Sequence, residues 1–239
     1  MRQIFCLLAF LAALACAQEA GPGRGVNFYS IEKEVALGRQ LAAEFEREHP
    51  PVADPAVQSR INDIGQRLAA HSGNSLLTYT FTLIADDPTV GHEPPAFPGG
   101  FVFVPERMIV AAKDDNELAG MLAHSMAHIA ARHGTKEATR AELGQISTMM
   151  IYMGGDPGSA MRRGSEMALP VKMRALHRSQ ELEADSLAVR MMAGAGYNPA
   201  GLARYIEREQ TSDDVPGSAM PSRAERLAVI QAAIAGLPK

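Results

Sequence analysis

The segment that most constrains the fold is an apolar stretch at residues 117–133, which contains two histidines four positions apart. Asp114 or Asp115 can cap a helix through this stretch, because a carboxylate there accepts hydrogen bonds from the first free backbone amides. Residues four apart project from one helical face, so His124 and His128 can direct two imidazole nitrogens at a single zinc ion. The pattern predicts half of a metal site, which still requires a third ligand and a fourth position.

A second helical segment contains residues that suit the missing part of this site. Glu181 and Asp185 lie one turn apart in the sequence QELEAD and therefore share a helical face. Glu181 can ligate zinc through its carboxylate, and Asp185 can accept a hydrogen bond from the second ring nitrogen of a ligating histidine. Either pattern alone is more typical of a packed or solvated helix, so the prediction depends on the two together.

Helical patterns also cover much of the remaining chain. Capping residues and apolar periodicity predict further helices at residues 30–47, 54–68, 175–193, 202–209 and 222–235. Alternating apolar residues predict strands at 77–84 and 101–104. We therefore expect one α+β domain, mainly α, over residues 18–239. Within it, the methionine-rich residues 135–173 are interpreted as a flexible or lid-like segment, with core filling as the alternative.

The first 17 residues have the pattern of a secretory signal peptide. Arg2 precedes an apolar run at residues 4–15, which is short for a bilayer span, and a small-residue cleavage pattern ends at Ala17. A retained membrane anchor is one alternative. Lipid attachment at Cys16 is another, although the residues before Cys16 fit a lipid-attachment sequence poorly. We predict an exported protein of the periplasm or extracellular space, with a lipoprotein as the lesser alternative.

Composition argues against disulfides, nucleic-acid binding and a transmembrane helix in the mature chain. Both cysteines, Cys6 and Cys16, lie in the signal segment, so if cleavage follows Ala17 we expect no disulfide or thiolate metal site in the mature chain. The formal net charge is −4 and basic residues are scattered, which argues against nucleic-acid binding. No run of eighteen apolar residues follows the signal segment, so we expect no transmembrane helix in the mature chain.

Three segments together resemble a known family of enzymes. Residues 94–134, with their HSMAH sequence, are similar to the core of gluzincin zinc metallopeptidases of the CAAX-prenyl-protease and HtpX group, particularly its soluble periplasmic branch. Residues 27–41 and 177–202 extend this similarity. The resemblance implies a zincin-like domain with one Zn²⁺ per chain. It implies that His124, His128 and Glu181 are the zinc ligands and that Asp185 is their outer partner.

The resemblance also implies a site for substrate. A small sheet would border the cleft, and its edge strand would bind an extended polypeptide as an additional strand. The residues that would form this edge are Gly99, Gly100, Phe101, Val102, Phe103 and Val104.

The chain departs from the family pattern at two positions near the metal. Ser125 stands where the family has the glutamate that takes a proton from zinc-bound water, and a serine hydroxyl cannot replace that base at neutral pH. Near the C-terminus, the family often has a His-Pro pair ahead of an arginine. Here Met220 precedes Pro221, ahead of Arg226, so this histidine is also missing.

Other groups near the predicted site could substitute for the missing base. His177 and Glu93 are candidates, whereas Glu183 lies on a different helical face from the predicted ligand. We expect His133, five positions after the second predicted histidine ligand, to point elsewhere and to have a capping or surface role.

These features favour a zinc-binding pseudopeptidase that binds extended or misfolded polypeptides in the bacterial envelope. An envelope protein partner is left open. One alternative is an active zinc metalloendopeptidase with a substitute base. A second alternative is a metal-free interaction module that retains only the fold.

Overall fold

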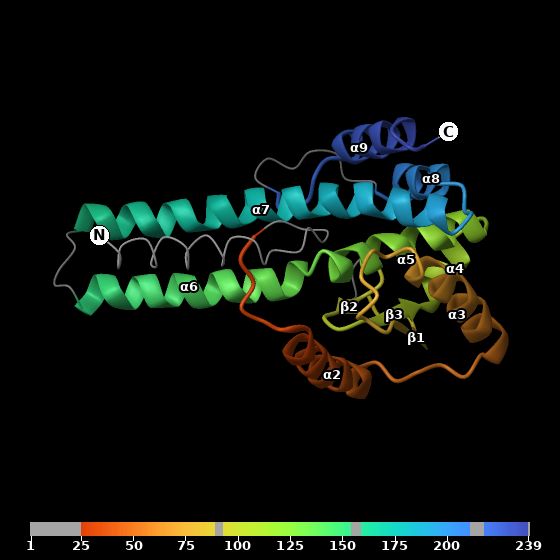
Figure 1. The fold of residues 1–239 in the computed structure, drawn as a ribbon, viewed down its shortest axis with the longest axis horizontal. Coiled ribbons are helices and arrows are strands. Elements are labelled where there is room, and N and C mark those ends of the chain that lie inside the picture. The colour runs from red at the N-terminus through yellow and green to blue at the C-terminus, as the bar shows by residue number, and fades with distance from the viewer. Residues whose placement is uncertain (1–24, 89–92, 154–158, 211–217, 239) are drawn as a thin grey trace, which may run out of the picture.

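The computed structural model describes residues 25–88, 93–153, 159–210 and 218–238 (Figure 1). The predicted signal peptide at residues 1–17 lies outside the described residues. The chain is mainly helical with one small mixed sheet, as the sequence predicts.

Two helices precede the sheet, and both start at predicted capping residues. Helix α2 (Ile31–Glu48) begins where the Ser30 side chain accepts a hydrogen bond from the Lys33 amide. Helix α3 (Pro55–Ala69) begins where Asp54 caps the amides of Ala56 and Val57. These caps stabilise backbone amides that have no partner inside the helix. Local sequence is therefore sufficient to set both helix starts.

The sheet has three strands: β1 (Thr80–Ile84), β2 (Ala96–Phe97) and β3 (Phe101–Pro105). Their order is β1-β3-β2, with β3 parallel to β1 and antiparallel to β2. The prediction that residues 99–104 form the edge of the sheet is therefore wrong, because β3 is the central strand. The outer strands of the described sheet are β1 and β2.

A glycine turn explains this arrangement. Gly99 and Gly100 have φ angles of 85° and 113°, in a region that side chains disfavour. A Cβ on Gly100 would lie 2.2 Å from the Thr78 carbonyl oxygen. The turn folds β2 back against β3, and the Phe103 amide also donates to the Pro95 carbonyl. Because β2 has two residues, alternation in the sequence does not reveal it.

Helix α5 (Asp115–Ala130) forms the centre of the core, and almost all of its residues are buried. Asp114 caps it, as predicted, by accepting from the Glu117 amide. It packs against α3, α7 (Ser159–Gly194) and α8 (Ala200–Glu209). Gly120 lies against the backbone of Leu202, so that α5 and α8 approach closely. This burial holds the predicted metal-site helix in place from several sides.

The remaining helices surround this core. Helix α4 (Glu106–Ala111) follows β3 directly, and α9 (Arg223–Ala235) packs on α7 and α8. The Ser222 and Glu225 side chains form the predicted capping box at the start of α9.

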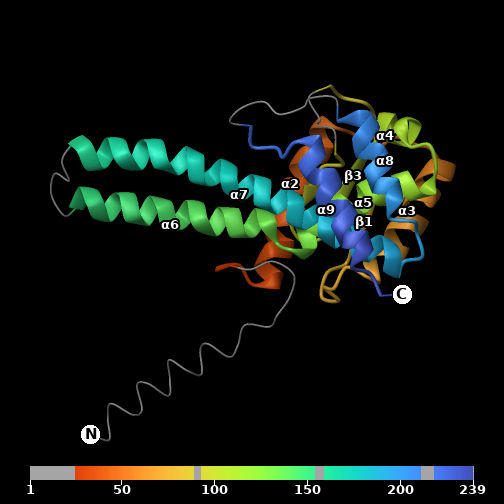
Figure 2. The same ribbon diagram turned by 90° about the horizontal axis from the view of Figure 1, so that it is seen from above.

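Helix α6 (His133–Met153) and the first part of α7 lie side by side and extend away from the rest of the molecule (Figures 1 and 2). They occupy the region interpreted from sequence as flexible or lid-like, and the structure there is helical except at residues 154–158, which lie outside the described residues. The far end of α7 returns to the core beside α5. No helix in the described part of the chain is both long and apolar enough to cross a membrane.

Candidate metal centre

Helix α5 places two histidines at the bottom of a cleft. His124 and His128 are one turn apart, and their Nε2 atoms lie 3.1 Å from each other. The His124 side chain is buried, whereas that of His128 is partly exposed. Because the two rings converge from one helical face, the prediction that both nitrogens reach one point agrees with the geometry.

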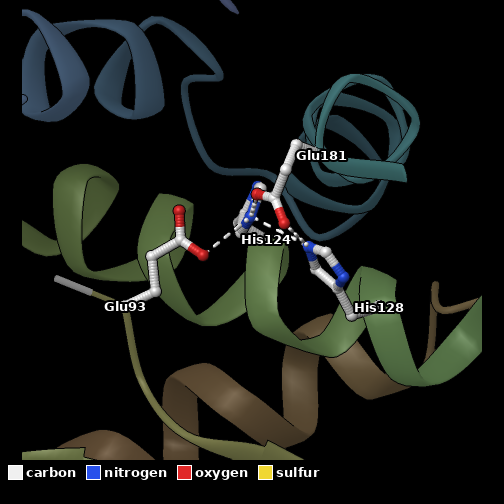
Figure 3. A group of neighbouring side chains, drawn as sticks. All are labelled: Glu93, His124, His128 and Glu181. Atoms are coloured by element: carbon white, nitrogen blue, oxygen red, sulfur yellow. Dashed lines mark hydrogen bonds and ion pairs between the residues drawn. The ribbon is translucent and has the colours of Figure 1, made fainter. Parts of the chain in front are cut away.

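Helix α7 brings a carboxylate to the same point (Figure 3). Glu181 Oε2 lies 3.3 Å from His124 Nε2, and Glu181 Oε1 lies 3.6 Å from His128 Nε2. A donor atom of Glu93 joins these three residues, and all four donor atoms lie within 4.8 Å of one another. The three predicted ligands therefore come together from two helices. His128 on α5 and Glu181 on α7 are 53 residues apart in the sequence.

This donor set fits a zinc ion. Zinc binds nitrogen and oxygen at about 2.0–2.2 Å, which separates the ligand atoms of a tetrahedron by roughly 3.3–3.6 Å. The separations of 3.1, 3.3 and 3.6 Å between the two imidazoles and Glu181 agree with this geometry. Among the described residues, none forms a hydrogen bond with the buried Glu181 Oε2, although His124 Nε2 lies nearby. Such an oxygen is available to a cation.

Asp185 lies behind His124, as the sequence predicts for an outer partner. Its Oδ1 atom is 2.8 Å from His124 Nδ1. This contact favours the tautomer with the proton on Nδ1, which leaves the Nε2 lone pair directed at the metal position. Asp185 is itself fully buried, and Arg226 on α9 donates to both of its oxygens at 2.9 and 2.8 Å.

Glu93, in the loop before β2, reaches the site from the side opposite α7. Its Oε2 atom lies 3.2 Å from His124 Nε2, and its Oε1 accepts from Arg226 Nη1 at 3.1 Å. Burial disfavours the charged carboxylate, but His124 and Arg226 outweigh burial and lower the pKa of Glu93 to about 2. Burial also disfavours a charged His124, yet Glu93 and Asp185 raise its pKa well above the ordinary value. The electrostatic field that favours a proton on His124 also favours a metal cation in its place.

His133 is part of the site, so the prediction of a capping or surface role is wrong. Its side chain is buried, with Nδ1 3.1 Å from His128 Nδ1 and Nε2 3.3 Å from Glu183 Oε2. Arg132 follows the end of α5 and has a φ angle of 59°. This turn changes the chain direction and brings His133 back toward His128. Burial, followed by the charges of His128 and Lys136, lowers the pKa of His133 to about 3. His133 therefore stays neutral and can fix the orientation of the His128 ring.

The substitute bases proposed from sequence occupy different positions. Glu93 is in the cluster. Glu183 contacts His133 and is not among the four clustered donors. His177 is about 43% exposed, and its Nδ1 atom lies 3.6 Å from Glu181 Oε1, also outside the four clustered donors.

Ser125 lines the cleft immediately after His124. Its side chain is buried, and its Oγ atom has no hydrogen-bond partner among the described residues. The hydroxyl is next to the metal position but contributes no negative charge there. Ser125 lies on α5, as the sequence predicts.

The cleft above the metal position has a volume of about 570 Å³. Ala96 of β2 lines one side of it, and Tyr205 and Ile206 of α8 lie among the residues that form its wall. An edge strand therefore borders the cleft, as expected, but this strand is β2. Met220, at the position where the family often has histidine, also lines the cleft.

Comparison with known proteins finds proteases among the relatives of this chain. The β-barrel assembly-enhancing protease of Escherichia coli (strain K12) is 23% identical over 187 residues, which cover 75% of this chain and 38% of that protein. The mitochondrial metalloendopeptidase OMA1 of Schizosaccharomyces pombe is 29% identical over 234 residues, covering 87% of this chain and 63% of the relative. The chain thus spans less than two thirds of the length of either relative.

A solved structure has the same fold. The crystal structure of Ste24p from S. mikatae is similar with a TM-score of 0.58 and 14% identity, over 84% of this chain and 55% of the other. At this identity the similarity establishes the fold alone, which is the zincin-like metalloprotease fold.

The sequence pattern of Peptidase family M48 matches residues 55–234, a range that includes α5, α7 and all three strands. Members of this family are zinc-dependent metallopeptidases. The chain belongs to peptidase family M48.

Proposed function

We propose that this protein binds one zinc ion through His124, His128 and Glu181 and holds extended polypeptides in its cleft while cleaving them poorly. The observation that carries the proposal is the combination of a converging ligand set with Ser125 at the position after His124. The ligand set supports metal binding, whereas the serine supports impaired hydrolysis.

The residues around the site support distinct roles. His124, His128 and Glu181 hold the metal, and Asp185 keeps His124 in the required tautomer. A bound zinc ion supplies Lewis acidity that polarises a peptide carbonyl. Peptide hydrolysis also needs a group that accepts a proton from water and returns it to the leaving amine, and the Ser125 hydroxyl does not ionise near neutral pH. General acid–base catalysis contributes about 10²–10⁴-fold, so we expect a loss of that size.

Strand β2 supports the binding of an extended peptide. It lies at the edge of the sheet, and Ala96 faces the cleft. Unpaired backbone groups on an edge strand can pair with an added strand. We propose that the polypeptide binds along β2, between the sheet and α8, in place of the edge predicted at residues 99–104.

The proposed location is the bacterial envelope, after export. This rests on the signal-peptide pattern at residues 1–17 and on the similarity to a β-barrel assembly-enhancing protease. The natural partner would be an extended or misfolded envelope polypeptide.

Zinc content and casein cleavage test the proposal directly. Elemental analysis of the purified mature protein should give about one zinc per chain. Unfolded casein should bind but be cut slowly, and Ser125→Glu should increase the chelator-sensitive cleavage rate by about 10²-fold or more. Absence of zinc in the unmodified protein would instead favour a metal-free interaction module. If the zinc-loaded Ser125→Glu variant remained inert, a missing base would not be the only defect.

A second candidate function is an active metalloendopeptidase in which Glu93 acts as the base. The close approach of Glu93 to His124 favours it. In that case the unmodified protein would cleave casein at rates typical of a peptidase, and Glu93→Gln would abolish cleavage without loss of zinc.

A further inference from the structure

Charge balance around the metal position points to a role for Glu93. Glu181 and Asp185 contribute two negative charges and Arg226 one positive charge, which leaves −1 beside two neutral imidazoles. A divalent cation bound to these groups alone would leave a net charge of +1 in a largely buried site. The carboxylate of Glu93 brings the sum to zero. Buried charges are tolerated when they are paired in this way.

The two oxygens of Glu93 have different partners. Oε1 accepts from Arg226 Nη1 at 3.1 Å. Oε2 lies 3.2 Å from His124 Nε2 (Figure 3). Arg226 also holds Asp185, which in turn holds His124. One guanidinium therefore orients both the histidine and the carboxylate toward the same point, as outer partners do at metal sites.

The position of Oε2 distinguishes a ligand from a base. A base that acts through a metal-bound water lies a further hydrogen bond, about 2.6–3.2 Å, beyond that water. The distance of 3.2 Å from Glu93 Oε2 to His124 Nε2 is instead close to the separations of 3.1 and 3.3 Å among the other donors. Glu93 Oε2 thus lies at a ligand-like separation from His124 Nε2, and a donor atom of Glu93 lies within 4.8 Å of the other three donors.

We propose that Glu93 is the fourth ligand of the zinc ion and closes the coordination position that catalytic zinc sites keep open for water. This inference rests on the zinc site of the proposed function and deepens it. It gives the protein a second cause of weak hydrolysis, independent of Ser125. The polypeptide would then bind in the cleft without contacting the metal, unless Glu93 is displaced.

Cobalt substitution tests the proposal without measuring catalysis. The full mature chain is loaded with Co²⁺, and azide is added while the visible spectrum is recorded. In the unmodified protein the spectrum should not change with azide, because no coordination position is free. In Glu93→Gln and Glu93→Ala, azide should enter and shift the bands. Competition with a chelator should also show that zinc affinity falls about 10-fold or more in these variants.

Glu209→Gln is the matched control, because Glu209 lines the same cleft but pairs with Arg208. It should behave as the unmodified protein in both measurements, and circular dichroism checks that every variant is folded. Equal azide binding by the unmodified protein and Glu93→Gln, with equal zinc affinity, would overturn the ligand role of Glu93. Failure of the unmodified protein to bind either metal would overturn the zinc site itself, and this inference with it.

Discussion

The two sides of the metal site are built differently. On the helical side, α5 and α7 supply His124, Glu181 and Asp185, all of which are buried. On the sheet side, Glu93 lies in a loop with its side chain about 33% exposed, and β2 has only two residues. Helices packed in a core fix side-chain positions closely, whereas a loop beside a short edge strand leaves room for a ligand to bind. The comparison indicates that the helices supply three of the four proposed ligands, whereas the sheet side supplies Glu93 and borders the cleft.

The largest expected effect is loss of the metal when a helical ligand is removed. His124→Ala should reduce zinc affinity by more than the roughly 10–100-fold that loss of an outer partner costs, because a bond to the metal itself disappears. Elemental analysis after dialysis measures it. His177→Ala is the control, since His177 is partly exposed and lies beside Glu181 but outside the donor cluster, and it should retain zinc. Equal zinc loss in both variants would contradict the assignment of the helical side.

The next effect concerns Arg226, which connects the two sides. Arg226→Met would leave Asp185 buried without its cation and release Glu93, so the free energy of unfolding should fall by about 3–5 kcal/mol. Urea denaturation measures this change. Arg178→Met is the control, because its partner Glu225 is largely exposed, and it should cost about 1 kcal/mol or less. If Arg226→Met left the free energy of unfolding unchanged, the two sides of the site would be held in place independently.

A substitution in the β2–β3 turn should affect the sheet side alone. Gly100→Ala forces an unfavourable backbone conformation and a clash with Thr78, at a cost of about 1–3 kcal/mol. We expect weaker binding of casein with normal zinc content. Gly134→Ala is the control, because its added methyl group meets only an ordinary contact with Pro98. Loss of zinc in Gly100→Ala would instead show that displacing this turn also displaces Glu93 from the metal.

The smallest effect is a pH dependence that arises on the helical side. The pKa of His133 is about 3 in the folded protein, below its value of about 6.5 in the unfolded chain. The unfolded state therefore binds the proton first, so this contribution to stability is present above pH 6.5 and decreases as the pH falls toward 3. Urea denaturation in chelator should show a loss of about 1 kcal/mol between pH 7 and 5.5. In His133→Asn this decrease should be smaller. If His133→Asn showed the same decrease in stability with pH, His133 would not be the source of this pH dependence.

Local sequence signals account for much of the helical side. The spacing of His124 and His128, and of Glu181 and Asp185, predicts the shared faces because helical geometry depends on sequence separation alone. Caps at Asp54, Ser222 and other residues likewise determine where helices start. The zincin-like fold is confirmed, whereas the ligand roles of these residues remain a prediction that the geometry supports.

The sheet side was less predictable from sequence. A β2 strand of two residues is too short for an alternating pattern, so the sequence predicts β3 as the edge. The sequence offers Glu93 as a candidate group near the metal, but its position depends on Arg226, which lies 133 residues further along the chain. No local pattern connects residues at that separation.

By itself, the sequence determined the helices, their polar faces and the residue Ser125 next to the first histidine. Only the tertiary structure decided which of these faces meet. It placed His133 against His128 through the turn at Arg132, and it made one guanidinium serve both Asp185 and Glu93. The physical reason is that periodicity and capping arise from neighbours along the chain, whereas strand order, burial and charge pairing arise from contacts between distant segments.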